Sequence, residues 1–187
     1  MRSKLLGRVL MAGALAVSAA VAATHDSANV PRTDAEIAKS VRHEILMYPN
    51  YTIWDDISFR VDNGSVELLG AVNQPFKKQD LGRLVQRVPG VASVTNELRV
   101  LPLSPNDDRL RLRVARAIYR DPALSRYGMQ AVPPIHIIVE NGHVTLDGIV
   151  NNQLEKQVAG MRASSAGLSF GPVINNLRVE NGSNKKS

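Results

Sequence analysis

The chain has 187 residues, of which 23 are lysine or arginine, 17 are aspartate or glutamate and none is cysteine. The absence of cysteine excludes disulfides, thiolate zinc sites and thiol catalysis, and also the residue that carries a bacterial lipoprotein anchor. The formal net charge at pH 7 is +6.

The first 23 residues have the three parts of a secretory signal peptide. Basic residues at Arg2, Lys4 and Arg8 precede an uncharged, mostly apolar run that ends in small residues at Ala22 and Ala23. This run is shorter than the ~20 residues of a membrane-spanning helix, and an uncleaved anchor is the alternative interpretation. We expect export and cleavage near Ala22 or Ala23. Cleavage leaves 20 basic against 17 acidic residues, or +3, which argues against a nucleic-acid-binding protein.

A helix is predicted early in the mature chain, and its pattern returns 73 residues later. In both copies an aspartate precedes apolar residues at spacings of three and four. This spacing places the apolar residues on one helix face, and the aspartate where it can cap free backbone amides. The matched positions are Asp34, Ile37, Val41 and Ile45 in the first copy and Asp107, Leu110, Val114 and Ile118 in the second.

A β-hairpin is predicted after each helix, because residues 57–72 and 135–150 align without a gap at an offset of 78. Apolar and polar residues alternate in both segments, which is typical of half-buried strands. An Asn-Gly pair between the two runs predicts a tight turn with positive φ. A second shared glycine, at the end of the hairpin, is expected to permit a close helix or a bend. The four glycines with these structural roles are Gly64 and Gly142 in the turns and Gly70 and Gly148 at the strand ends.

A second helix and a closing strand complete each copy, with the helices expected over residues 75–88 and 153–166. The sequence thus predicts an α+β fold of two αββαβ modules, each a three-stranded sheet packed against two helices. We place the modules at residues 34–102 and 106–180, joined by a proline-containing linker. A polar tail, residues 181–187, is expected to be disordered.

The repeated pattern resembles the BON domain. The segments that carry the resemblance are "VDNGSVELLGAV", "VPGVASVTNELRV", "VENGHVTLDGIV" and "VINNLRV". Two such domains behind a signal peptide are similar to osmotically inducible periplasmic members of that family. The resemblance implies a periplasmic protein that associates with phospholipid membranes or with envelope proteins. It also implies a role in envelope integrity or in the response to stress. It implies neither enzymatic activity nor a cofactor.

The second copy departs from this pattern in two places. Its second helix is rich in alanine and has Arg162 where the first copy has Leu84, so we expect that helix to pack less deeply. The connection over residues 119–134 is also longer than in the first copy.

Candidate catalytic and metal sites are not evident in the sequence. No two of the four histidines show the short helical spacing of a metal site, and there is no G-x-S-x-G or phosphate-binding glycine loop. A G-x-x-G clamp for nucleic acid is missing as well. We therefore expect no catalytic residues, no metal and no nucleic-acid partner.

One helix face carries an arginine stripe, which we define as Arg109, Arg113, Arg116 and Arg120. Their spacings of 4, 3 and 4 place them within a band roughly 60° wide. Like charges at this spacing repel one another, and guanidinium groups bind phosphate well. The stripe is a candidate binding site for anionic phospholipid, with an ordinary solvated helix face as the alternative.

The loop after the stripe could insert apolar side chains into a membrane, and we include Tyr127 in the candidate lipid site because amphipathic rings favour the membrane interface. Filling of the small core is the competing interpretation for part of this loop. The other members considered are Tyr119, Leu124, Met129 and Val132.

The leading functional hypothesis is an envelope-maintenance or stress protein that touches anionic phospholipid mainly through its second module. The alternative is an adaptor or chaperone that binds envelope proteins. It would use exposed sheet edges or the loop over residues 47–54, in which Met47, Tyr48, Tyr51 and Trp54 cluster.

Overall fold

The computed structural model describes residues 32–167 and 169–180. The expected signal peptide and C-terminal tail lie outside these ranges. Within them, no helix is both long enough and apolar enough to cross a membrane.

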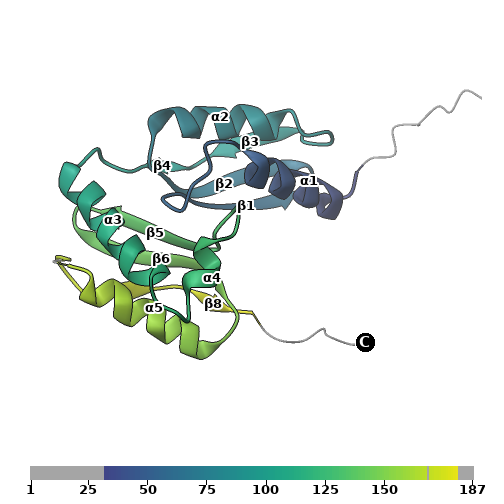
Figure 1. Ribbon diagram of the computed structural model, residues 1–187. Helices are drawn as coiled ribbons and strands as arrows, with labels where there is room; N and C mark the ends of the chain where they lie inside the picture. Colours follow the sequence, from purple (N-terminus) through teal and green to yellow (C-terminus); the bar gives the residue numbers. More distant parts are fainter. Residues whose placement is uncertain (1–31, 168, 181–187) are drawn as a thin grey trace, which may run out of the picture. The chain divides into compact units, whose positions relative to one another are not determined.

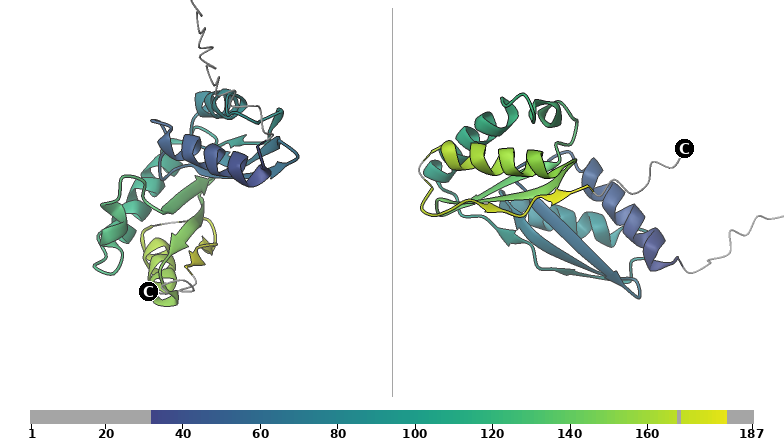
Figure 2. Two further views of the ribbon diagram at one scale, coloured as in Figure 1. Left: turned by 90° about the vertical axis from the view of Figure 1, so that its right-hand side faces the viewer. Right: turned by 90° about the horizontal axis from the view of Figure 1, so that it is seen from below.

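The first module contains the predicted helix, hairpin, helix and closing strand in that order. Its sheet has β2 in the middle, antiparallel to β1 and parallel to the short strands β3 and β4. Figures 1 and 2 show both helices on one face of this sheet. The elements are α1 (Asp34–Met47), β1 (Asp56–Asp62), β2 (Ser65–Val72), α2 (Pro75–Gln86), β3 (Ser93–Asn96) and β4 (Arg99–Val100).

The second module repeats this arrangement, with β6 antiparallel to β5 and parallel to β7 and β8. The predicted α+β fold of two αββαβ modules is thereby confirmed, with one short extra helix, α4, in the long connection. The elements are α3 (Pro105–Tyr119), α4 (Ser125–Gly128), β5 (Ile135–Glu140), β6 (His143–Val150), α5 (Gln153–Ser165), β7 (Ile174–Asn175) and β8 (Arg178–Val179).

The closing strand of each module is divided into two segments for a local reason. The side chain of Asn96 accepts a hydrogen bond from the Leu98 N–H at 3.2 Å and donates one to the Lys78 carbonyl of α2 at 2.7 Å. Leu98 is fully buried, so the chain turns inward here and leaves the ladder. Asn175 makes the same two kinds of bond in the second module.

The two cores are filled in different ways. Leu81 and Val85 of α2 are fully buried, and their counterparts on α5 are Ala159 and Ala163, with exposed fractions of 0% and 3%. The expectation that α5 packs less deeply is therefore wrong. The side-chain volume that these alanines lack is supplied to the same core by the long connection, through Leu124 and Tyr127.

The aspartate at the start of each first helix clamps the hairpin turn. The carboxylate of Asp34 accepts both backbone N–H groups of the first Asn-Gly turn, at 2.8 and 2.9 Å. Asp107, which is 2% exposed, does the same in the second module at 2.9 and 2.8 Å. The predicted capping role is wrong, because the helix caps are Thr33 and Ser104.

The shared glycines meet two different demands. Gly64 and Gly142 have φ of 76° and 77°, which confirms the expected turns. We expected Gly70 and Gly148 to permit a close helix or a bend. They have φ of 112° and 126°, and the nearest neighbour of each is a backbone carbonyl, not a helix. A Cβ at Gly148 would lie 1.8 Å from the Pro134 carbonyl oxygen of the neighbouring chain segment, and Gly70 faces a carbonyl in the same way.

A buried ion pair ties the loop before β1 to the start of α2. Lys77 Nζ lies 2.7 Å from Asp55 Oδ2, with side-chain exposures of 4% and 0%. The Asp55 carboxylate also accepts the N–H and hydroxyl of Thr52, at 3.0 and 2.8 Å, and the N–H of Asn73 at 3.0 Å. Every donor that a buried carboxylate needs is thus present.

Candidate functional site

The arginine stripe lies on the exposed side of α3. Arg109, Arg113, Arg116 and Arg120 are all exposed, while the opposite side of the helix contributes Leu110, Val114 and Ile118 to the core. None of the four arginines belongs to a salt bridge formed within residues 32–167 and 169–180. The stripe is therefore a line of positive charge that no acidic side chain of the described ranges neutralises by direct contact.

A fifth arginine of the same helix has a structural role instead. Arg111 is 5% exposed and donates to the Val139 carbonyl at 2.6 Å and to Asp108 at 2.5 Å. The bond to Val139 attaches α3 to β5, and the bond to Asp108 lies within α3. Spacing along the helix separates Arg111 from the stripe, because residues two apart face different directions.

A groove lies beside the stripe, between α3 and the loop that precedes β7. Arg109, Arg113 and Arg116 line it together with Leu112 and Phe170. Phe170 is 81% exposed and Leu112 is 47% exposed. We did not predict either residue from the sequence. The position of Phe170 in a glycine-rich loop, outside any strand pattern, was a signal that could have indicated an exposed aromatic ring.

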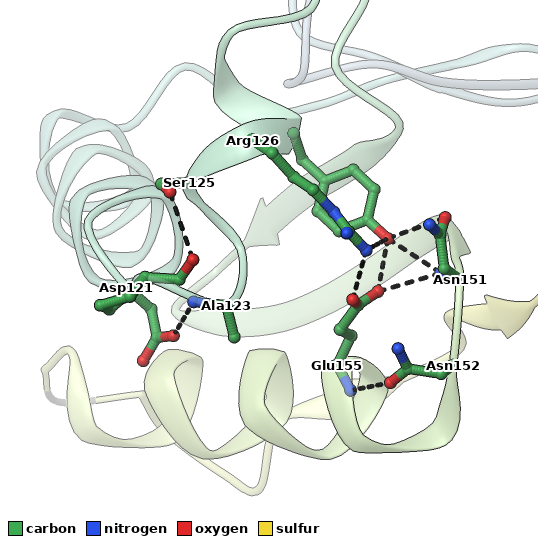
Figure 3. Close-up of polar contacts among 9 residues, drawn as sticks. Asp121, Ala123, Ser125, Arg126, Asn151, Asn152 and Glu155 are labelled. Atoms are coloured by element: carbon green, nitrogen blue, oxygen red, sulfur yellow. Dashed lines mark hydrogen bonds and ion pairs between the residues drawn. The ribbon is translucent and has the colours of Figure 1, made fainter.

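Tyr127, which we predicted at the lipid site, is not on the surface. It is 3% exposed and belongs to the second core. Its hydroxyl donates to Glu155 Oε2 at 2.5 Å and accepts from the Asn151 N–H at 2.8 Å. Figure 3 shows Arg126 approaching the same carboxylate at the start of α5, and the two form an ion pair. Tyr127 therefore fastens the long connection to α5 and is unavailable to a membrane.

The other residues of that connection divide between core and surface. Leu124 is fully buried and Tyr119 is partly buried, with its hydroxyl donating to the Ile135 carbonyl at 2.7 Å. Val132 is half-buried and Met129 is 86% exposed. The interpretation that at least two of these side chains fill the core is thus correct for Leu124 and Tyr127.

A second contact fastens the beginning of the connection. Asp121 accepts the Ala123 N–H at 2.9 Å, drawn in Figure 3, and Arg162 Nε of α5 at 2.6 Å. The Ala123 N–H and the Arg162 guanidinium together lower the pKa of Asp121. This contact explains why arginine stands at position 162, where the first module has Leu84.

The Glu155 contacts predict an acid-dependent loss of stability. Burial alone would raise the pKa of Glu155, but hydrogen bonds from Tyr127 and the Asn151 N–H, with the charge of Arg126, outweigh it and lower the pKa. A lowered carboxylate pKa stabilises the fold above the unfolded-state pKa, and this contribution is lost as the pH falls through the folded-state value. We expect Glu155→Gln to be less stable than wild type at neutral pH, and the difference to shrink in acid.

Urea unfolding of both proteins between about pH 7 and pH 3 measures this difference. Glu97→Gln is the control, since Glu97 is exposed and its variant should follow the wild-type curve. A difference for Glu155→Gln that stays constant with pH would contradict the prediction.

The loop over residues 47–54, on which the protein-binding alternative relied, is largely engaged within the chain. Tyr48 is buried and donates to Asp80 at 2.9 Å. Tyr51 lies 3.3 Å from His136 between hydroxyl and Nε2 atoms, and Trp54 packs against the second core. Met47 alone of the four is well exposed, at 60%.

Comparison with known proteins gives one family. Two solved structures of CdsD, a structural protein of the type III secretion system of Chlamydia trachomatis, resemble the chain weakly. The first is 16% identical with a TM-score of 0.31, over 78% of this chain and 61% of that one. The second, the CdsD C-terminal domain, is 15% identical with a TM-score of 0.31, over 80% and 67%. Scores this low support no conclusion here, and no curated protein matches the chain.

The family model of the BON domain matches twice, over residues 33–102 and 106–181. Both matches coincide with a helix, a clamped hairpin, a second helix and a divided closing strand. The chain therefore belongs to the BON-domain family and carries the domain in tandem.

Proposed function

We propose that the protein is a non-enzymatic periplasmic protein of envelope maintenance or stress, and that its second module binds anionic phospholipid surfaces through the arginine stripe. BON domains are linked in general to phospholipid binding and to envelope or stress roles. The observation that carries the proposal for this chain is the line of four exposed arginines, none of which forms a salt bridge within the described residues 32–167 and 169–180.

The first module does not offer the same surface. Its corresponding helix α1 carries Lys39 and Arg42 beside the acidic residues Glu36 and Glu44. Mixed signs on one helix reduce the attraction to an anionic surface, because the charges oppose one another within a Debye length of ~8 Å at physiological ionic strength. The two modules thus differ in charge arrangement although they share a fold, and this supports assigning the contact to the second one.

The size of the electrostatic contribution sets what the stripe can do alone. A basic residue near an anionic bilayer contributes ~1 kcal/mol, so four contribute ~4 kcal/mol. That free energy corresponds to a dissociation constant of ~1 mM. The stripe therefore gives weak, salt-sensitive binding that needs an additional contact to become firm.

The alternative function, an adaptor or chaperone for envelope proteins, has less support. The aromatic residues expected to form its binding loop are engaged by Asp80, His136 and the second core. Exposed sheet edges remain as its basis.

The experiment is vesicle flotation of the Arg113→Glu/Arg116→Glu variant. Two reversals remove two attractions and add two repulsions of ~1 kcal/mol each, so we expect binding to anionic vesicles to fall by about two orders of magnitude or more. The wild-type protein should bind anionic vesicles, dissociate from them at high salt, and not bind zwitterionic vesicles.

The matched control is Lys39→Glu/Arg42→Glu on α1, which changes the net charge equally at exposed positions of the first module. It should keep most of its binding. If both variants lose binding to anionic vesicles equally, the binding depends on net charge and not on the stripe. If the wild-type protein does not float with these vesicles, the lipid-binding proposal is wrong.

A further inference from the structure

Phe170 is an exposed aromatic residue that the structure holds in place. Its N–H donates to the Gly142 carbonyl at 3.0 Å, and Ser169 Oγ donates to the Gly171 carbonyl at 2.6 Å. The ring lies so close to the hairpin turn that a Cβ at Gly142 would be 2.3 Å from Phe170 Cδ2. The turn supports the ring while 81% of the residue stays exposed. The contact with the turn buries too little of the side chain to offset the free-energy cost of exposing a phenylalanine to water.

The first module makes the same backbone contact without the ring. The Ala92 N–H donates to the Gly64 carbonyl at 2.9 Å, so Ala92 occupies the place of Phe170. The position of Leu112 on α3 corresponds to Lys39 on α1, 73 residues earlier. The second module thus has phenylalanine and leucine at the positions where the first has alanine and lysine.

These apolar side chains line the same groove as three members of the stripe. Gly167 brings the loop against Arg113, since a Cβ there would lie 3.1 Å from the guanidinium carbon. The acidic residue in the groove, Asp107, has both oxygens occupied by the turn N–H groups. Among the described residues, the guanidinium groups of this groove form no salt bridge, and they lie next to exposed apolar side chains.

We propose that this groove is a composite membrane-anchoring site. It rests on the proposed function: Arg109, Arg113 and Arg116 bind phosphate groups of an anionic bilayer, while Phe170 and Leu112 enter the hydrocarbon beneath them. Phosphate above and hydrocarbon below is the charge and polarity order of a bilayer surface, and aromatic rings are favoured at that boundary. The insertion provides the contact that four surface charges alone lack.

The first test uses the absence of cysteine from the chain. Phe170→Cys gives a single attachment site for an environment-sensitive fluorophore, and Ala92→Cys gives the matched site in the first module. With phosphatidylglycerol-containing vesicles, we expect a blue shift and quenching by acyl-chain-brominated lipid at position 170 and neither at position 92. Equal responses at both positions, or none at 170 while the protein floats, would overturn the insertion.

The second test separates this site from the stripe. Phe170→Ser should weaken binding to anionic vesicles about tenfold and abolish the fraction that resists salt, with thermal unfolding unchanged. Unchanged binding by Phe170→Ser, beside loss in Arg113→Glu/Arg116→Glu, rejects the insertion and leaves the proposed function intact. If wild type does not float, both fail. A label at position 170 that responds to an acidic protein surface but not to vesicles overturns the lipid assignment.

Discussion

Replacing Gly148 by alanine is expected to prevent the hairpin of β5 and β6 from forming with its present backbone geometry. The residue has φ of 126°, a conformation that residues with a Cβ rarely adopt, and the new Cβ would lie 1.8 Å from the Pro134 carbonyl oxygen. That oxygen also accepts the Ile149 N–H at 3.1 Å, so relief of the clash separates the strands. We expect the free energy of unfolding to fall by more than ~4 kcal/mol.

Denaturant unfolding monitored by circular dichroism measures this loss. Gly171→Ala is the control, because a Cβ there would meet a ring atom of His143 no closer than 3.3 Å. A Gly148→Ala protein that unfolds at the wild-type midpoint, or a control that is equally damaged, would show that the close carbonyl is not the constraint.

Replacing Asp55 by alanine is expected to cost the first module about 3–5 kcal/mol, because it leaves the buried Lys77 ammonium without its counter-ion. The variant also leaves the N–H groups of Thr52 and Asn73 without an acceptor. Lys77→Met should cost less than Asp55→Ala, since three other donors to the carboxylate remain and the apolar stem still packs.

The same unfolding measurement tests the pair, with Arg83→Ala as the control. Arg83 forms a 2.7 Å ion pair with Asp80 on the exposed side of α2, and exposed pairs contribute less than ~1 kcal/mol. The prediction fails if Asp55→Ala is no more damaging than Arg83→Ala.

The fold was predictable because its signals are local. Strand alternation, Asn-Gly turns and helix spacing each depend on neighbouring residues, and duplication presented every signal twice. The stripe was placed on the exposed face of α3 for the same reason: the buried positions Leu110, Val114 and Ile118 fix the direction of the helix.

The errors concern contacts between distant segments. Tyr127 is buried because the alanines of α5, about 30 residues later, leave volume that another side chain must fill. The Asp107 side chain does not cap its own helix, because it accepts hydrogen bonds from two backbone N–H groups of the hairpin turn. The position of Phe170 likewise depends on a backbone bond to Gly142. None of these pairings follows from spacing along the chain.

The buried charges at the start of α2 and α5 affect which of the two similar modules each helix can pair with. Lys77 and Glu155 are 78 residues apart and occupy equivalent positions, yet their signs are opposite and so are those of their partners, Asp55 and Arg126. If the two helices exchanged places during folding, a lysine would face an arginine and a glutamate would face an aspartate. The contact between the glutamate and Asp55 would lie in a buried site, where such repulsion costs several kcal/mol. The repulsion beside Arg126 would be weaker, because that side chain is 53% exposed. We therefore expect the reversed signs to disfavour pairing of either module with the second helix of the other.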